Sequence, residues 1–155
     1  MTPATSLELE MCSEPRCLPE IRERIRHWME TRDWSEPQVG EIVLALDEAV
    51  TNVIRHGYDN RPEQPIEIRV DSIADQEHGE GLEIRVRDYG KQVDPAVICG
   101  RDLDDIRPGG LGVHIIRAMT SNCEYRRADG GGMLLIMRKF RTHTADYGGR
   151  MAERG

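Results

Sequence analysis

The chain carries the stretch SEPQVGEIVLALDEAVTNVIRHG at residues 35–57, which is its clearest helical signal. Ser35 suits the N-cap of this helix, Pro37 suits its first turn, and Gly57 suits its C-terminal end. Its apolar residues recur at helical spacing. They predict one buried face, made of Val39, Ile42, Val43, Leu46, Ala49, Val50, Val53 and Ile54.

A second helix and a short strand are predicted ahead of this stretch. Residues 15–32 place apolar side chains at helical spacing, with arginines and glutamates on the opposite side. The residues expected to be buried are Leu18, Ile21, Ile25, Trp28 and Met29. Residues 6–11 alternate weakly between apolar and polar side chains, so we expect a short edge strand there.

Alternating apolar residues predict an antiparallel hairpin after a loop at residues 59–65. Residues 65–73 and 81–88 carry its two strands, and the polar residues 74–80 carry its turn.

The remaining pattern predicts a helix and a second hairpin. The helix covers residues 111–120, and the hairpin strands cover 122–128 and 133–140 around a glycine-rich turn at 129–132. Ahead of the helix, residues 89–110 lack a firm periodicity and are rich in Asp, Pro and Gly. A loop of that length inside a compact domain is usually functional.

The predicted order of elements favours an α+β fold. Consecutive strands are joined by short turns, which is typical of a two-layer α/β sandwich with a mostly antiparallel sheet and helices on one face. A doubly wound parallel fold would need helices between successive strands. Without an internal repeat or a linker, residues 1–140 are expected to form one domain and residues 141–155 a polar tail.

The composition and charge of the chain exclude some classes of function. The 155 residues are 38% hydrophobic and 32% charged, which fits one soluble domain with a real core. The formal net charge of −7 argues against direct nucleic-acid binding, where basic side chains neutralise phosphates. No signal peptide is apparent at the N-terminus, and no apolar stretch approaches the roughly 18 residues that span a bilayer. We therefore expect a cytoplasmic protein with no membrane contact.

Three polar residues within the helix predicted at residues 35–57 suggest a binding or catalytic site. Glu48, Asn52 and His56 follow each other at steps of four residues, and each step on an α-helix drifts only about 40° around the axis. On such a stripe Asn52 could give an oxygen to Mg²⁺, and Glu48 could take a proton from an attacking hydroxyl. Asp47 is rotated by about 100° from Glu48 and is the weaker candidate. The same spacing is also typical of a solvated helix face.

A second pattern is Asp88-Tyr89-Gly90, at the end of a predicted strand. An aspartate at this place can accept a hydrogen bond from an exocyclic amine such as that of adenine. Gly90 has no Cβ, so a ring could approach its backbone closely. An ordinary turn at a strand end would have the same residues.

The third pattern runs from Gly109 and Gly110 through Leu111 and Gly112 directly into a predicted helix. Free backbone N–H groups at a helix N-terminus favour bound phosphate. No Lys-Ser/Thr pair follows, so this is not a P-loop, and the spacing does not fit a Rossmann motif. A plain glycine-rich turn is the alternative.

Taken in this order, the three patterns resemble the GHKL superfamily of ATP-binding domains, and more closely the anti-sigma-factor serine kinases of bacteria. The segment LDEAVTNVIRHGY, which starts at Leu46, is similar to the N box of that family. DYGKQVDP, from Asp88, is similar to its first glycine box. DLDDIRPGGLGVHII, from Asp102, is similar to its short lid and second glycine box. The resemblance covers about residues 6–140.

The resemblance implies a Bergerat fold with ATP and Mg²⁺ between the long helix and the lid. By position, Asn52 matches the magnesium-binding asparagine, Glu48 the proposed catalytic base and Asp88 the adenine-binding aspartate. The glycines that match those approaching adenine and phosphates are Gly90, Gly110 and Gly112, with Gly109 and Leu111 beside them. His56 would flank the phosphates or cap the helix end.

The implied function is that of an ATP- and Mg²⁺-dependent protein-serine kinase in a partner-switching circuit. Members of this family bind a sigma factor and phosphorylate a serine of a small antagonist protein with a STAS fold. The phosphate then prevents the antagonist from releasing the sigma factor. The resemblance also allows a homodimer.

Two departures from the family pattern keep other functions open. Gln92 stands where the D-x-G-x-G box has its second glycine, and Gly131-Gly132-Met133 stands where the family has a Gly-Thr pair that assists adenine binding. They motivate an alternative in which the chain is a non-catalytic module that senses a nucleotide or binds a partner. A detached histidine-kinase catalytic domain is a third interpretation, which autophosphorylation on histidine would support.

Overall fold

The structure is a computed structural model that describes residues 6–92 and 110–141. This part of the chain forms one five-stranded sheet in the order β1-β2-β3-β5-β4, with every neighbouring pair antiparallel. The strands are β1 (Ser6–Cys12), β2 (Pro65–Asp75), β3 (Gly79–Asp88), β4 (Asn122–Arg127) and β5 (Met133–Phe140). The predicted edge position of β1 is confirmed.

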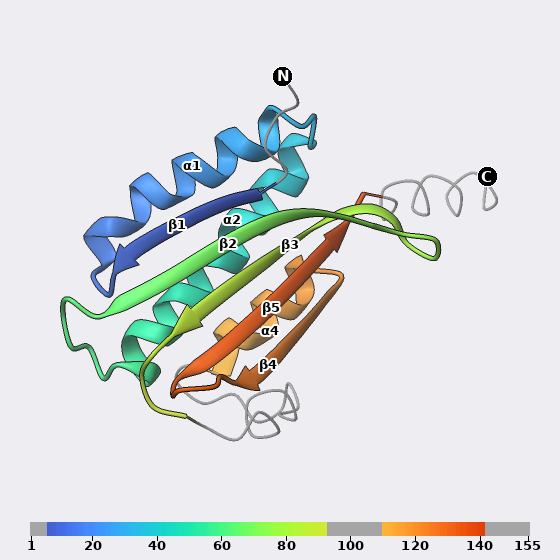
Figure 1. Cartoon of the computed structure of the whole chain (residues 1–155). Helices are drawn as coiled ribbons and strands as arrows, with labels where there is room; N and C mark the ends of the chain where they lie inside the picture. Colours follow the sequence, from blue (N-terminus) through green and yellow to red (C-terminus); the bar gives the residue numbers. More distant parts are fainter. Residues whose placement is uncertain (1–5, 93–109, 142–155) are drawn as a thin grey trace.

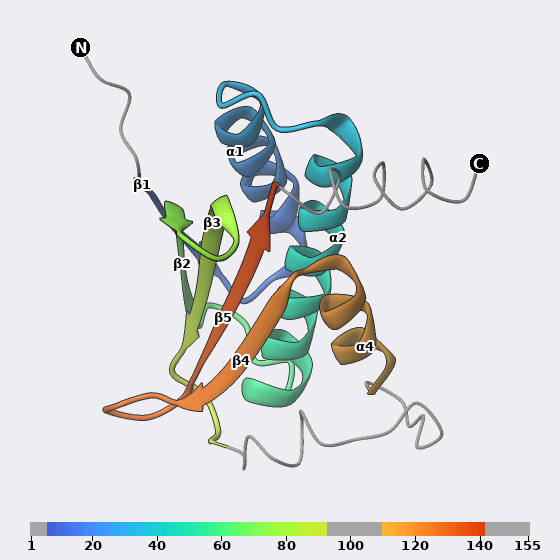
Figure 2. The same ribbon diagram turned by 90° about the vertical axis from the view of Figure 1, so that its right-hand side faces the viewer.

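Three α-helices in the described residues cover one face of this sheet: α1 (Leu18–Glu30), α2 (Glu36–Asn52) and α4 (Gly110–Met119). In Figure 1 the strands lie in front of α2, and Figure 2 shows the helices together on one side of the sheet. α2 packs against both α1 and α4. The predicted α+β sandwich, with a mostly antiparallel sheet and helices on one face, is confirmed.

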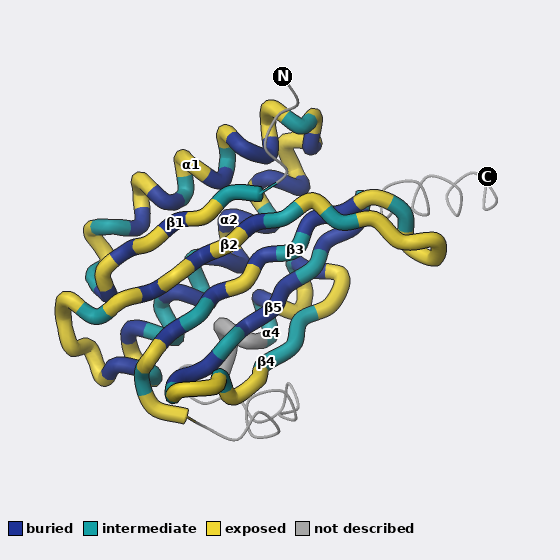
Figure 3. The backbone as a smooth tube through the Cα atoms, viewed as in Figure 1, coloured by how far each residue is buried: buried dark blue, intermediate teal, exposed yellow. Residues whose placement is uncertain are grey.

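The two faces of the sheet have opposite character, and Figure 3 shows buried and exposed positions alternating along its strands. Toward the helices, β2 and β3 bury Ile66, Ile68, Val70, Leu82, Ile84 and Val86. On the open face, charged residues pair with each other. Arg69 lies 2.9 Å from Glu8 and 2.8 Å from Asp71. Because side chains alternate with a period of two, this pattern fixes the face that packs against the helices.

The predicted buried faces of the two N-terminal helices are confirmed, except that Val53 is partly exposed. Ser35 caps α2 in a capping box with Gln38, since each side chain accepts a hydrogen bond from the backbone N–H of the other residue. The predicted helix at 15–32 is shorter than expected. It begins with a 3₁₀ turn, η1 (Pro15–Cys17), and α1 then ends at Glu30.

The prediction that residues 53–57 continue the α-helix is wrong. α2 ends at Asn52, and the following η2 (Val53–Gly57) is π-helical. The backbone N–H of Tyr58 closes its wide turn by donating to the Val53 carbonyl at 2.9 Å, five residues earlier. A π turn rotates less per residue than an α turn. The step from Asn52 to His56 therefore departs from the α-helical spacing that was expected to put both on one stripe.

The first hairpin has a shorter turn than predicted. β2 extends to Asp75 and β3 begins at Gly79, so residues 76–78 form the turn instead of 74–80. The Asp75 carboxylate accepts a hydrogen bond from the backbone N–H of His78 and closes this turn. Polar residues at the tips of both strands concealed their true length.

The C-terminal elements agree with the sequence to within one residue. α4 begins at Gly110, β4 ends at Arg127, and β5 has the predicted bounds. Most of the predicted loop at 89–110, including Gly109, and the predicted tail from residue 142 onward lie outside the described residues. None of the helices within 6–92 and 110–141 combines the length and apolar composition required to span a bilayer.

Candidate functional site

Elements that carry the predicted site meet at one end of the sheet. Figures 1 and 2 place the end of α2, the end of β3, the start of β5 and the start of α4 at the lower end of the molecule. Backbone N–H groups link the residues after β3 to η2, and the start of β5 to the end of β3. The N–H of Lys91 donates to the Gly57 carbonyl at 2.9 Å, and the N–H of Met133 donates to Asp88 Oδ1 at 3.2 Å.

Asp88 is the buried polar centre of this region, with only 3% of its surface exposed. Its Oδ1 atom accepts hydrogen bonds from the backbone N–H groups of Gly90, at 2.9 Å, and Met133, at 3.2 Å. Among the described residues, Oδ2 has no hydrogen-bond partner. Burial raises the pKa of the Asp88 carboxyl, and the two N–H donors oppose that rise. The carboxylate thus keeps one oxygen available as an acceptor.

Glycines allow the backbone to pack closely around Asp88. A Cβ atom on Gly90 would lie 2.2 Å from the Gly57 carbonyl oxygen, and one on Gly132 would lie 2.0 Å from the Asp88 carbonyl oxygen. Gly132 also has a φ of +75°, which L side chains rarely adopt. Gly90 is therefore required by the neighbouring backbone of η2, in addition to its predicted role beside a ring.

Tyr58 lies beside Asp88, and the sequence motifs assign it no role. It is 1% exposed, its hydroxyl donates to the Pro65 carbonyl at 2.6 Å, and it accepts from the Tyr89 N–H at 2.7 Å. Desolvation by burial raises the pKa of its hydroxyl. Tyr58 thereby ties the end of η2 to β2 and to the residue after Asp88. Its place directly after Gly57 in the first motif was the available sequence signal.

Glu48 and Asn52 lie on α2, one turn apart, which is about 6 Å along the helix axis. Both are half-buried, and neither has a hydrogen bond or ion pair with another described residue. The adjacent Asp47 lies 2.7 Å from Arg22 of α1 and is engaged in that ion pair. His56 is exposed on η2. Glu48 and Asn52 are thus the two half-buried polar groups of this pattern that no other described residue engages.

The backbone that the sequence predicts to bind phosphate lies in the first residues of α4. Gly110, Leu111 and Gly112 form its first turn, where backbone N–H groups have no helical acceptor. α4 packs against α2. Glycines at the start of a helix fit an anionic ligand, and a half-buried amide oxygen such as that of Asn52 fits a magnesium ion bound to that ligand.

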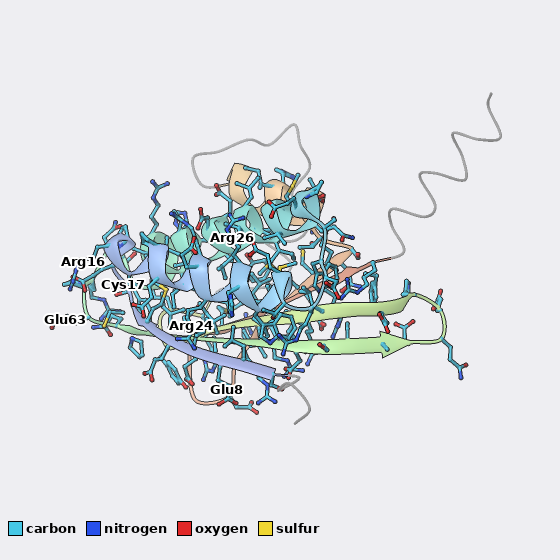
Figure 4. All side chains as sticks on the ribbon, turned by 90° about the horizontal axis from the view of Figure 1, so that it is seen from above. Glu8, Arg16, Cys17, Arg24, Arg26 and Glu63 are labelled. Carbon is cyan, nitrogen blue, oxygen red and sulfur yellow. The ribbon has the colours of Figure 1, made fainter. Side chains whose placement is uncertain are left out.

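A separate groove of about 500 Å³ lies between β1 and α1. Glu8, Met11, Cys17, Ile21 and Arg24 are among the residues that line it. Figure 4 shows Glu8 on the β1 side of this groove and Cys17 and Arg24 on the helix side. It contains none of the predicted site residues and is distinct from the region around Asp88.

Comparison with known proteins shows the family to which this chain belongs. Residues 11–139 match the family described as histidine kinase-like ATPase domain. The serine/threonine-protein kinase BtrW of Bordetella bronchiseptica is 28% identical over 118 residues, which cover 71% of this chain and 80% of that protein.

Solved structures share the fold at lower identity. The RsbU and RsbW domains of a Mycobacterium tuberculosis protein give a TM-score of 0.61 at 17% identity, covering 89% of this chain and 33% of that one. This chain therefore spans about a third of that structure. The SiaB-SiaC complex of Pseudomonas aeruginosa gives a TM-score of 0.57 at 13% identity, covering 86% of this chain and 88% of that one. With a family match over most of its length, the chain belongs to the histidine kinase-like ATPase family, the GHKL group that its motifs resemble.

Proposed function

We propose that this protein is an ATP-dependent protein-serine kinase that acts as an anti-sigma regulatory factor and phosphorylates a STAS-type antagonist. The observation that carries the proposal is the placement of buried Asp88, with one oxygen left as an acceptor, at the end of the sheet where α2 ends and α4 begins. The resemblance of the motifs and the similarity to BtrW, which is named as a serine/threonine-protein kinase, support it.

In the proposed binding mode, each element recognises one part of ATP. Asp88 Oδ2 accepts a hydrogen bond from the exocyclic amine of adenine, and Gly90 lies beside the ring. The N–H groups at Gly110 and Gly112 bind phosphate oxygens, with Gly109 and Leu111 contributing backbone and His56 flanking the phosphates. The side-chain oxygen of Asn52 would hold Mg²⁺.

Glu48 is the proposed catalytic base. Its carboxylate accepts the proton of the substrate serine hydroxyl while the serine oxygen bonds to the γ-phosphorus. The bond between that phosphorus and the β–γ bridging oxygen breaks, and ADP leaves with the electron pair. Mg²⁺, when bound, neutralises negative charge on the transferring phosphoryl group, and the α4 N-terminus adds to this effect.

Transfer of the γ-phosphate of labelled ATP to a purified STAS-domain antagonist from the same organism tests this function. Phosphate on a serine of the antagonist is the expected result. Phosphate on a histidine of this chain would instead indicate a detached histidine-kinase domain. ATP binding without any transfer to candidate antagonists would contradict the kinase and favour a nucleotide-sensing module.

Two departures from the family pattern favour a second function, a partner-binding module that does not catalyse transfer. Gln92 replaces a family glycine, and Met133 follows Gly132 where the family has threonine. Both residues lie close to Asp88 or to the turn that contacts it. A chain that binds a sigma factor or antagonist equally well with and without ATP would fit this alternative. We also propose that the chain binds a sigma factor and forms a homodimer.

A further inference from the structure

The turn between β4 and β5 lies directly against Asp88. Residues 129–132 include three glycines with positive φ, which are +86° at Gly130, +106° at Gly131 and +75° at Gly132. The closest approach is at Gly132, where a Cβ atom would lie 2.0 Å from the Asp88 carbonyl oxygen. The position of this turn therefore affects the position of Asp88.

Gln92 holds this turn with both N–H groups of its side-chain amide. Its Nε2 donates to the Ala128 carbonyl at 2.9 Å and to the Gly132 carbonyl at 3.1 Å. A side-chain amide has two such donors, so both are used. Gly132 also accepts from the backbone N–H of Ala128 at 3.0 Å. Gln92 thus joins the residue just before the turn to the last residue of the turn.

Arg87 binds the carbonyl groups between those two points. Its Nη2 donates to Asp129 at 2.9 Å and its Nη1 to Gly131 at 2.6 Å, and Nη1 also donates to the carbonyl of Asp88. Four carbonyl groups from Ala128 to Gly132 therefore accept hydrogen bonds from two side chains, those of Arg87 in β3 and of Gln92 after it. We call Arg87 and Gln92 the turn clamp.

The turn clamp determines where the next backbone donor lies. Met133 follows Gly132 directly, and its N–H donates to Asp88 Oδ1 at 3.2 Å. The Gly132 carbonyl and the Met133 N–H belong to the same planar peptide unit. Gln92 therefore holds the carbonyl of that unit, and Asp88 holds its N–H. Loss of the Gln92 bond leaves the Gly132 carbonyl held by the Ala128 N–H alone, which gives this peptide unit more freedom to rotate.

We propose that Gln92 is a positioning residue for adenine recognition. By holding the Gly132–Met133 peptide, it keeps Asp88 Oδ1 engaged by backbone donors and leaves Oδ2 as the acceptor for the adenine amine. The inference rests on the proposed ATP binding and deepens it. Gln92 stands where the family motif has a glycine, and its side chain supplies two hydrogen-bond donors that position the turn beside Asp88.

The geometry also predicts base selectivity. Adenine offers an amine donor where guanine offers a carbonyl acceptor. A carboxylate oxygen held in place favours the donor and opposes the acceptor, because an unpaired buried acceptor is costly. If the carboxylate could turn freely, this discrimination would weaken along with affinity. Gln92 itself is exposed, so water can replace its bonds to the turn and the fold should tolerate its loss.

The test compares Gln92→Glu with the parent and with Lys91→Met as a matched control. Glutamate keeps the shape of Gln92 but places carboxylate oxygens against two carbonyl oxygens and cannot donate. Lys91 is the adjacent residue, and its exposed side chain pairs with Asp59 at 2.9 Å, away from the turn clamp. Affinities for Mg·ATP and Mg·GTP are measured by calorimetry, and exchange of the Met133 amide hydrogen is followed by NMR without nucleotide.

For Gln92→Glu we expect at least tenfold faster exchange at Met133, about tenfold weaker ATP binding and a smaller ratio of ATP to GTP affinity, with the melting temperature near that of the parent. Lys91→Met should match the parent in all four. ATP affinity and selectivity within twofold of the parent in Gln92→Glu would overturn the inference. A parent that fails to bind ATP would refute the proposed function and the positioning role with it, whereas the exchange data would separately report whether Gln92 holds the turn.

Discussion

The backbone N–H of Met133 donates a hydrogen bond to Oδ1 of Asp88 across 3.2 Å, although 45 residues separate them. This bond joins the start of β5 to the end of β3. It shows that the carboxylate is held by the protein backbone, with Gly90 as its second donor. The buried Asp88 carboxylate should affect both the stability of the fold and the binding of a ligand, and separate measurements can test the two effects.

Asp88→Asn should leave the folded protein as stable as the parent at neutral pH, or more stable. The asparagine Oδ1 can accept the same two N–H groups, and the neutral amide avoids the cost of burying a charge. Urea unfolding at pH 7 measures the difference. A loss of about 3 kcal/mol or more would show that the charge itself stabilises the fold, as buried ion pairs do.

The pH dependence of this comparison has a definite sign. Burial raises the pKa of Asp88 above its ordinary value of about 3.9, so over the intervening pH range the native state retains a proton that the unfolded state has released. The stability of the parent relative to Asp88→Asn is greatest below the ordinary pKa and falls as pH rises through the raised one. Unfolding curves for both proteins across this range test it, and a parent that gained relative stability with rising pH would contradict it.

Gly132→Ala should destabilise the protein by roughly 3 kcal/mol, because the alanine combines a strained positive φ with a Cβ only 2.0 Å from the Asp88 carbonyl oxygen. Gly130→Ala is the matched control. Its φ of +86° is also strained, but no atom lies within 4 Å of its Cβ position, so about 1 kcal/mol is expected. Denaturant unfolding measures both. Equal losses of stability in the two variants would mean that Gly132 does not pack closely against the Asp88 backbone.

Glu48→Gln should slow phosphate transfer to the antagonist by about a hundredfold or more while ATP binding persists, since glutamine cannot accept the serine proton. Asp47→Asn is the control from the neighbouring position, where the carboxylate is engaged by Arg22 at 2.7 Å. Its transfer rate should stay close to that of the parent. If Glu48→Gln transferred phosphate as fast as the parent, another group would have to be the base.

Gly40→Ala should stabilise the protein by about 0.5–1 kcal/mol. Gly40 is exposed within α2, and no atom lies within 4 Å of the Cβ that alanine would add. Alanine favours the helix because it loses less backbone entropy on folding. Thermal unfolding checks the gain. A decrease in stability would mean that this part of α2 is under strain.

Periodic patterns predicted the elements well because burial follows them closely. The alternation in β2 and β3 and the helical spacing in α1 and α2 each correspond to residues that are buried in the core. Boundaries that depend on local hydrogen bonds were missed. The change from α- to π-helix at Val53 and the closure of the hairpin turn by Asp75 and His78 leave no periodic signal.

Candidate site residues could be named where side-chain chemistry marks them, as for Asp88, Glu48 and Asn52, and their roles stay predictions. The partners of Asp88 could not be predicted in the same way, because Gly90 and Met133 contact it through backbone N–H groups that every residue except proline carries. Gln92 was interpreted from the motif as a lost glycine. The two bonds that its side chain makes to Ala128 and Gly132 depend on a turn 36 residues or more further along the chain.

Calorimetric titration with ATP and Mg²⁺, for the parent and for Asp88→Asn, tests the central claim most directly. The account predicts saturable binding to the parent with a dissociation constant between about 1 μM and 1 mM, the range typical of enzyme substrates. It predicts about a hundredfold weaker binding to Asp88→Asn, whose amide would direct a donor at the adenine amine. No detectable heat with the parent at several times that upper concentration, or equal affinity in the two proteins, would contradict a nucleotide site built on Asp88.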